Sequence, residues 1–298
     1  MNAKPLLILL LLPVVALAAG HDTNVSDSDS LKIAALEALM SAPPEKALPI
    51  VDKVLAGNHS NEVKERALFI LSQFDSSEAQ ATLLRFARED TGELQVEAIR
   101  MIGIGGDKEA LANLRDIYQT GNREVRDAVL EAYLIADDAT SVYEIAVSAD
   151  NEEDFSEAVD MLGAMGARDE LRELRSRAGM SETLIDAYAI SGDYETLREL
   201  ALDSSDPELQ TKAIEAMGII GGDEVDNTLV EIYRGADSED VREAALDGLL
   251  ISGHDEGVLE LYRAATDPGE KRQLLEYLVI MDSDAIYDVI DQALAGDR

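Results

Sequence analysis

Hydrophobic positions along residues 206–236 follow the period of two short helices with a glycine stop between them. In the first helix they recur at i, i+4, i+7, i+8 and i+11, on one face of a 3.6-residue helix. These positions are Leu209, Ala213, Ala216, Met217 and Ile220. Asp206 can cap this helix, Pro207 suits its first position, and Gly221 and Gly222 end it. Because such a pair cannot bury both faces alone, we expect it to stack on similar neighbours.

The two-helix unit recurs about nine times between residues 31 and 298. Each repeat can be aligned on the small or apolar residue that opens the apolar pair of its first helix, and the anchors are about 30 residues apart. The anchors are Ala35, Ala67, Ala98, Val129, Ala158, Leu184, Ala213, Ala245 and Leu274. Residues 246–253 (LDGLLISG) also match residues 185–192 (IDAYAISG). Self-similarity of this kind predicts an all-α fold, a right-handed α-solenoid (α-α superhelix) of about nine two-helix repeats.

Two parts of the array depart from the pattern. The first repeat, residues 31–57, carries three prolines and is expected to cap the array, as is the last repeat. The repeat anchored on Leu184 is short and follows the arginine cluster of residues 168–177. Its first helix has room for little more than two turns.

The amino terminus has the layout of a secretion signal. Lys4 precedes an almost wholly apolar run from Leu6 to Ala18, which is shorter than the ~20 residues that span a membrane. Ala16-Leu17-Ala18 fits the small-x-small cleavage pattern. The predicted organisation is a signal peptide over 1–18, a flexible polar leader over 19–30 and the repeat array over 31–298. Ser30 is expected to cap the first helix. We therefore expect an exported protein, periplasmic or extracellular, without a membrane span after cleavage.

Three phrases in the array resemble the opening of HEAT repeats. They are Glu62-Val-Lys-Glu-Arg-Ala-Leu, Glu124-Val-Arg-Asp-Ala-Val-Leu and Asp240-Val-Arg-Glu-Ala-Ala-Leu. The endings Gly103-Ile-Gly-Gly-Asp107 and Gly218-Ile-Ile-Gly-Gly-Asp223 match the second half of the short bacterial repeat type, also found in phycobilin-lyase-like proteins. The resemblance implies a binding scaffold and does not imply catalysis. Gln95, Ser156 and Thr211 stand where the arginine of the opening phrase would be.

Charge narrows the set of partners. Asp and Glu number 61 against 25 Lys and Arg, which gives a formal net charge of −36. Such a surface repels nucleic acid and anionic membranes, and it favours a protein with a basic surface or a cation. The chain has no cysteine, and its three histidines, His21, His59 and His254, stand far apart in the leader or in turns. We therefore expect no catalytic residue, no cofactor and no metal site.

Three tyrosines occupy matching contexts in the second helices. Tyr118, Tyr233 and Tyr262 are candidate partner contacts, because tyrosine is favoured at interface hot spots. Alternatively they complete the apolar stripe, with the hydroxyl reaching solvent.

The sequence thus predicts a non-enzymatic, exported protein-binding scaffold or assembly factor with an acidic surface. A lyase-like or chromophore-handling accessory enzyme and an acidic cation-binding surface protein stay open as alternatives.

Overall fold

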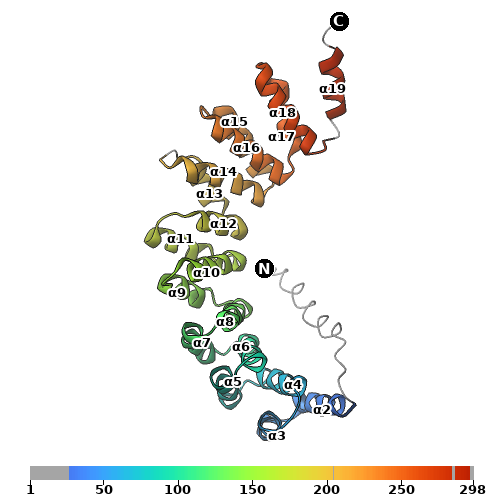
Figure 1. Cartoon of the computed structure of the whole chain (residues 1–298), viewed down its shortest axis with the longest axis vertical. Coiled ribbons are helices and arrows are strands. Elements are labelled where there is room, and N and C mark those ends of the chain that lie inside the picture. Colours follow the sequence, from blue (N-terminus) through green and yellow to red (C-terminus); the bar gives the residue numbers. More distant parts are fainter. Residues whose placement is uncertain (1–26, 204, 284–285, 296–298) are drawn as a thin grey trace, which may run out of the picture. The chain divides into compact units, whose positions relative to one another are not determined.

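The computed structural model describes residues 27–203, 205–283 and 286–295 (Figure 1). Within these residues the chain forms 18 α-helices in nine consecutive pairs, one 3₁₀ turn and no strand. The predicted all-α solenoid of about nine two-helix repeats is therefore confirmed. The predicted signal peptide and residues 19–26 lie outside the described residues.

The chain divides into two compact units, residues 1–132 and 133–298, with the boundary inside helix α8. The helices of residues 27–136 are α2 (Asp27–Ala38), η1 (Leu39–Ser41), α3 (Pro44–Ala56), α4 (Asn61–Ser72), α5 (Ser77–Glu89), α6 (Glu93–Gly105), α7 (Lys108–Thr120) and α8 (Arg123–Ala136). Those of residues 139–295 are α9 (Ala139–Ser148), α10 (Glu152–Met165), α11 (Arg168–Ala178), α12 (Glu182–Ser191), α13 (Tyr194–Ala201), α14 (Pro207–Ile220), α15 (Asp223–Gly235), α16 (Glu239–Ser252), α17 (Asp255–Ala264), α18 (Pro268–Ile280) and α19 (Ile286–Ala295).

Even-numbered helices are the first helices of their repeats, and several of them pack on the first helix of the next repeat. In unit 1 these contacts join α2 to α4 and α4 to α6; in unit 2 they join α10, α12, α14 and α16 in order. In Figure 1, α10 and α12 lie to the right of the second helices α9 and α11. Eight of the nine predicted anchors, all except Ala35, are fully buried at 0% exposure. Periodicity therefore identified the apolar spine shared by neighbouring repeats.

Local capping follows the sequence closely in the repeat of α14 and α15. The Asp206 carboxylate accepts the backbone N–H of Leu209 at 3.2 Å, and Pro207 occupies the first helical turn. Gly221, at φ 62°, ends α14 in a conformation that residues with a side chain rarely adopt. The predicted cap, first residue and stop are all confirmed.

Two expectations at the amino terminus are wrong. Helix α2 begins at Asp27 and includes Ser30, because Asp27 and Asp29 suit the positive end of the helix and Lys32 Nζ binds Asp29 Oδ1 at 2.7 Å. The leader therefore cannot extend to residue 30. Ala35 is exposed, whereas Leu36 is buried, so the anchor of this repeat lies one residue later.

The position assigned to the repeat arginine also needs correction. Arg242 Nη1 donates to the Ala236 carbonyl at 2.7 Å, and Gln210 Nε2 donates in the same way to the Ala201 carbonyl at 3.0 Å. Gln210, and not Thr211, is therefore the counterpart of Arg242. Thr211 instead bonds to carbonyls in its own helix. A glutamine at this position ties the first helix to the end of the preceding repeat without adding charge.

Consecutive first helices approach each other through residues that have little or no side chain. Gly218 of α14 faces the backbone of Gly248 in α16, and a Cβ on Gly218 would collide with the Gly248 carbonyl oxygen. A Cβ on Gly163 would lie 3.1 Å from the Ala187 Cα in α12. Glycine inside a helix costs roughly 1 kcal/mol relative to alanine. We attribute its presence here to the close backbone packing that only glycine permits.

Replacing Gly218 with alanine should lower stability by about 1–3 kcal/mol, because the new methyl group overpacks the contact with α16. Urea unfolding measures the loss. Gly235→Ala is the control, because Gly235 is also a helical residue, the last of α15, but has nothing within 4 Å of its Cβ position. This control should be neutral or stabilising by up to about 1 kcal/mol. Equal stability of the two variants would contradict close packing at Gly218.

A buried carboxylate orders the short repeat formed by α12 and α13. Asp193 is 1% exposed and accepts two hydrogen bonds from Arg172 of α11, at 2.6 and 2.8 Å. Its carboxylate also accepts the hydroxyl of Thr196 at 2.8 Å and the Thr196 backbone N–H, which caps α13. Burial acts to raise the pKa of Asp193, but the hydrogen bonds from Arg172 and Thr196 outweigh it and lower the pKa below its ordinary value. The predicted arginine cluster thus has a structural role here.

Asp193→Ala should reduce stability at pH 7 by about 2–4 kcal/mol, because the change removes a helix cap and charged hydrogen bonds together. A carboxylate with a lowered pKa stabilises the fold above its unfolded pKa and loses this effect as pH falls through its folded pKa. The gap between the parent protein and the variant should therefore shrink in acid.

The control is Asp169→Ala, since Asp169 also faces Arg172, at 3.8 Å, but is 96% exposed. Its removal should cost less than about 0.5 kcal/mol. A gap for Asp193→Ala that stays constant from pH 7 into the acid range would contradict this account.

Candidate partner-binding face

Four first helices of unit 2 present the same pair of residue types to solvent. Each carries an acidic residue two positions after its anchor and an isoleucine four residues further on. The acidic row is Asp186, Glu215, Asp247 and Glu276, and the isoleucine row is Ile190, Ile219, Ile251 and Ile280. Residues at i and i+4 lie one above the other on a helix surface, so the two rows run side by side across α12, α14, α16 and α18. We refer to them together as the two-row face.

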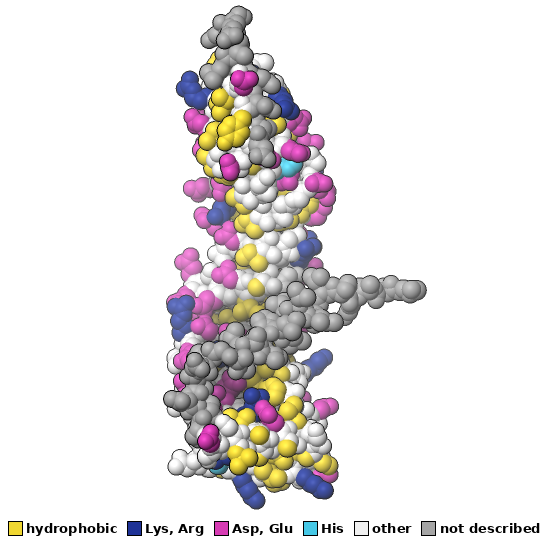
Figure 2. All heavy atoms as spheres, turned by 90° about the vertical axis from the view of Figure 1, so that its right-hand side faces the viewer, with side chains coloured by type: hydrophobic (Ala, Val, Ile, Leu, Met, Phe, Trp, Pro, Cys, Tyr) yellow, Lys and Arg dark blue, Asp and Glu magenta, His cyan; other side chains and the backbone are white. Residues whose placement is uncertain are grey.

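The isoleucines of this face are exposed well beyond what a core position allows. Their exposed fractions are 56% for Ile190, 54% for Ile219, 53% for Ile251 and 65% for Ile280. Figure 2 views the molecule from the first-helix side, and hydrophobic and acidic side chains are both exposed in its upper part, where unit 2 lies. A repeated exposed apolar residue beside charges is typical of an interaction surface.

The carboxylates are close enough to affect each other's ionisation. Partial burial, and then the Asp247 and Glu243 carboxylates, raise the pKa of Glu215 against the opposing effect of Lys212. Asp160 lies in α10, the first helix of the repeat before these four. Partial burial and then the Asp186 carboxylate raise its pKa. Repulsion along the acidic row is thus part of the folded state, and a cationic partner would relieve it.

Contacts between neighbouring repeats hold the row in register. Lys212 Nζ lies 3.7 Å from Asp186 Oδ1, and the Tyr277 hydroxyl donates to Asp247 Oδ1 at 2.6 Å. The pattern is not continuous beyond these four helices. Helices α4 and α6 have Phe69 and Arg100 at the equivalent acidic position, and α10 has Ala164 where the isoleucine would be. Glu131 and the exposed Ile135 of α8 repeat the pair, but Glu131 is bound by Arg100 at 2.9 Å. The two-row face is therefore the unbroken run from α12 to α18.

The magnitudes show why both rows matter. Burying an isoleucine completely is worth ~1.5–3 kcal/mol, so covering four half-exposed ones yields roughly 3–6 kcal/mol. Association itself costs about 4–15 kcal/mol. The isoleucine row alone therefore reaches only the lower end of that cost, and the acidic row has to supply further attraction and orientation.

The three candidate tyrosines are not on this face. Tyr118 is 6% exposed and Tyr233 is 3% exposed, so their rings belong to the core. The expectation that these two rings contact a partner is wrong, because the second helices need them to complete their apolar stripe. Tyr262 is half-buried, with the Lys271 ammonium 5.3 Å from its ring centre. A partner contact at Tyr262 stays a prediction.

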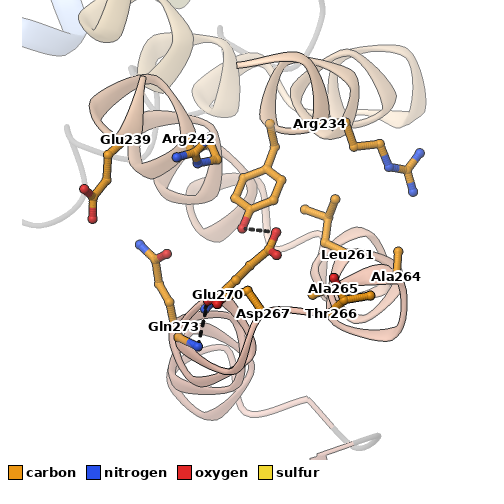
Figure 3. Close-up of a pocket in the computed structure, with 12 residues that line it drawn as sticks. Arg234, Glu239, Arg242, Leu261, Ala264, Ala265, Thr266, Asp267, Glu270 and Gln273 are labelled. Atoms are coloured by element: carbon orange, nitrogen blue, oxygen red, sulfur yellow. Dashed lines mark hydrogen bonds between the residues drawn. The ribbon is translucent and has the colours of Figure 1, made fainter. Parts of the chain in front are cut away.

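An open groove of about 830 Å³ lies where α15, α16, α17 and α18 meet (Figure 3). At its wall the Tyr233 hydroxyl donates to Glu270 at 3.2 Å, and burial followed by this carboxylate raises the pKa of Tyr233 to about 12. Asp267 caps α18, Arg242 binds the Ala236 carbonyl, and Arg234 reaches outward to Glu260 at 2.7 Å (Figure 3).

Tyr233, Arg242 and Asp267 of this groove are therefore already engaged in contacts that hold neighbouring helices and turns. A second groove of the same kind lies in unit 1 between the turns around Asp90 and Gly121. Both follow from the repeating layout, in which consecutive inter-repeat turns leave a space between them. This recurrence favours a structural origin for the grooves over a reaction site.

The described histidines take part in local contacts. His254 precedes α17, and its Nδ1 lies 3.3 Å from Oδ2 of the buried Asp226 in α15. His59 lies in the turn before α4, and His21 lies outside the described residues. Among the residues that the structure describes, no three His, Asp or Glu side chains gather to form a metal site. No helix in the described part of the chain is long and apolar enough to cross a membrane.

Sequence reasoning missed the two-row face, although the signal was present. The matching segments 185–192 and 246–253 both contain an aspartate followed four residues later by an isoleucine. Comparing the exposed columns of the repeats, and not only the buried ones, would have shown both rows.

Comparison with known proteins agrees with the repeat geometry. A family model described as HEAT repeats matches residues 53–134 and 139–250, which is more than half of the chain. The protein therefore belongs to the HEAT-repeat family, as the resemblance predicted. No curated protein matches the chain.

Two solved structures are similar along most of their length. Human deoxyhypusine hydroxylase in complex with glycerol is 22% identical over 87% of this chain and 93% of that one, with a TM-score of 0.36. The complex of CpcE and CpcF of phycocyanin lyase from Nostoc sp. PCC7120 is 18% identical over 84% and 93%, with a TM-score of 0.30. At these TM-scores the similarity says nothing about activity.

Glu215→Gln should raise the melting temperature at pH 7, because it removes a carboxylate that its neighbours repel. A carboxyl group with a raised pKa binds protons more tightly in the folded state, so the fold gains stability as pH falls through that pKa. The melting temperature of the parent protein then approaches that of the variant, and the difference between the two should narrow near pH 4. Glu231→Gln removes the same charge from the exposed surface of α15 and is the control. Equal shifts in both variants would show that net charge alone is responsible.

Proposed function

We propose that this protein is an exported, non-enzymatic protein-binding scaffold or assembly factor that recognises a partner with a basic surface. The two-row face is the observation that carries this proposal. It offers repeated apolar contacts flanked by carboxylates on rigid helices, which is the combination that a protein interface uses. HEAT repeats provide extended surfaces on which many weak contacts add up.

Export is supported by the amino-terminal sequence, with its single lysine, its apolar run and the cleavage pattern before Ala19. The net charge of −36 suits a surface that attracts basic partners and keeps away from nucleic acid and anionic lipid. The engaged polar groups of the Tyr233 groove give no support to the alternative of a chromophore-handling enzyme. The cation-binding alternative likewise has no support from a cluster of ligands in the described residues.

Photo-crosslinking in the exported fraction tests this function. A crosslinking amino acid is placed at Ile219 or Ile251 on the two-row face, and at Val147 or Leu202 as control positions. Val147 and Leu202 are 45% and 60% exposed but lie off the rows. Crosslinks to one discrete protein are expected from the first pair, from a mature chain that begins at Ala19. Crosslinks that are absent, or equal at all four positions, would refute the proposal, and so would retention of the chain inside the cell.

A further inference from the structure

The two-row face is specific enough to define what lies on it. We infer that its occupant is a basic amphipathic α-helix of the partner, with Lys or Arg along one flank and aliphatic side chains along the other. This inference rests on the proposed function, since it names the kind of partner segment that the scaffold would hold. It adds a shape, a register and a length to the expectation of a basic partner.

Complementarity to both rows excludes simpler ligands. A purely cationic ligand, such as a polyamine or calcium, would leave the isoleucines in water. A purely apolar segment would take the carboxylates out of water without a partner, which is unfavourable. Within the described residues, the ion pairs of the acidic row are limited to Lys212 with Asp186. The other carboxylates therefore have charge to offer an incoming cation.

The spacing of the rows favours a helix over a strand. The acidic residue and the isoleucine of each of the four first helices are four positions apart, so the two rows lie about 6 Å apart along the helix axes. A ligand that contacts both rows must therefore present two adjacent rows of side chains to one surface. An amphipathic helix does this with neighbouring flanks of its surface. A strand sends successive side chains to opposite faces, so only one of its rows can face the protein.

The number of helices sets the length of the segment. Helices α12, α14 and α16 pack in order, and the hydrogen bond from Tyr277 to Asp247 joins α18 to α16. With about 8–10 Å between neighbouring helices, the first and last rungs lie roughly 24–30 Å apart. A helix of about 18 residues is ~27 Å long. Each repeat then supplies one acidic and one apolar contact, and affinity should fall stepwise as the segment is shortened.

Fluorescence anisotropy with the mature chain, residues 19–298, tests this directly. The probe is a labelled 18-residue peptide of Lys and Leu arranged with helical period, lysines on one flank and leucines on the other. Three further peptides replace Leu with Ser, replace Lys with Glu, or keep the composition with a strand period of two. The first peptide should bind at least about tenfold more tightly than each of the others. Equal binding of the Ser or the period-two peptide would overturn the inference.

Paired variants locate the site. Ile219→Ser with Ile251→Ser, and separately Asp186→Asn with Glu215→Gln, should each weaken binding about tenfold or more. The controls are Val147→Ser with Leu202→Ser, and Glu195→Gln with Glu231→Gln, which make the same chemical changes elsewhere in unit 2. They should change binding less than about twofold. Circular dichroism and melting temperature confirm that each variant is folded before binding is compared.

Equal losses of peptide affinity in the row variants and the control variants would mean that overall charge or non-specific hydrophobic contact drives binding. That result would overturn the inference. Competition by spermidine as effective as competition by unlabelled peptide would do the same. If Ile219 and Ile251 crosslink to a discrete protein but the helical peptide does not bind, the scaffold function stands and only the helical partner is refuted. If there is neither crosslinking nor peptide binding, the proposed function itself is refuted.

Discussion

Close backbone packing between consecutive first helices is the constraint on which the rest of this structure depends. Gly218 against Gly248, and Gly163 against Ala187, let neighbouring helices approach where side chains would hold them apart. The glycines weaken their own helices by roughly 1 kcal/mol each. This cost is offset only if the neighbouring repeat is present, so the repeats depend on one another for stability.

The same packing orients the surface to which we assign function. In α14, Gly218 faces the next repeat, and the residue after it, Ile219, turns outward. The equivalent positions of α12, α16 and α18 hold Ala189, Leu250 and Val279, and the residue after each is again an exposed isoleucine. Glu215, one helical turn before Ile219, shares this outward face. A regular array therefore converts one exposed isoleucine and one carboxylate per helix into two continuous rows. The partner surface is a consequence of repetition and not of any single repeat.

Local features of the fold could be predicted from the sequence, because periodicity, capping and glycine stops act over a few residues. Asp206, Gly221 and the buried anchors such as Ala213 are of this kind. Contacts over longer sequence distances could not be predicted. Asp193 contacts Arg172, which lies 21 positions earlier in the chain. Only the packed structure shows that this arginine, one of the cluster in residues 168–177, has a structural role. The burial of Tyr118 and Tyr233 likewise depends on how the second helices face their neighbours.

The central claim is that neighbouring first helices stabilise each other through their glycine contacts and thereby form the two-row face. Amide hydrogen exchange of a Gly218→Val variant of the mature chain tests it most directly. The account predicts that protection falls in both α14 and α16, on the two sides of the contact, while α4 and α6 of unit 1 keep theirs. Loss of protection confined to α14, with α16 unchanged, would contradict it.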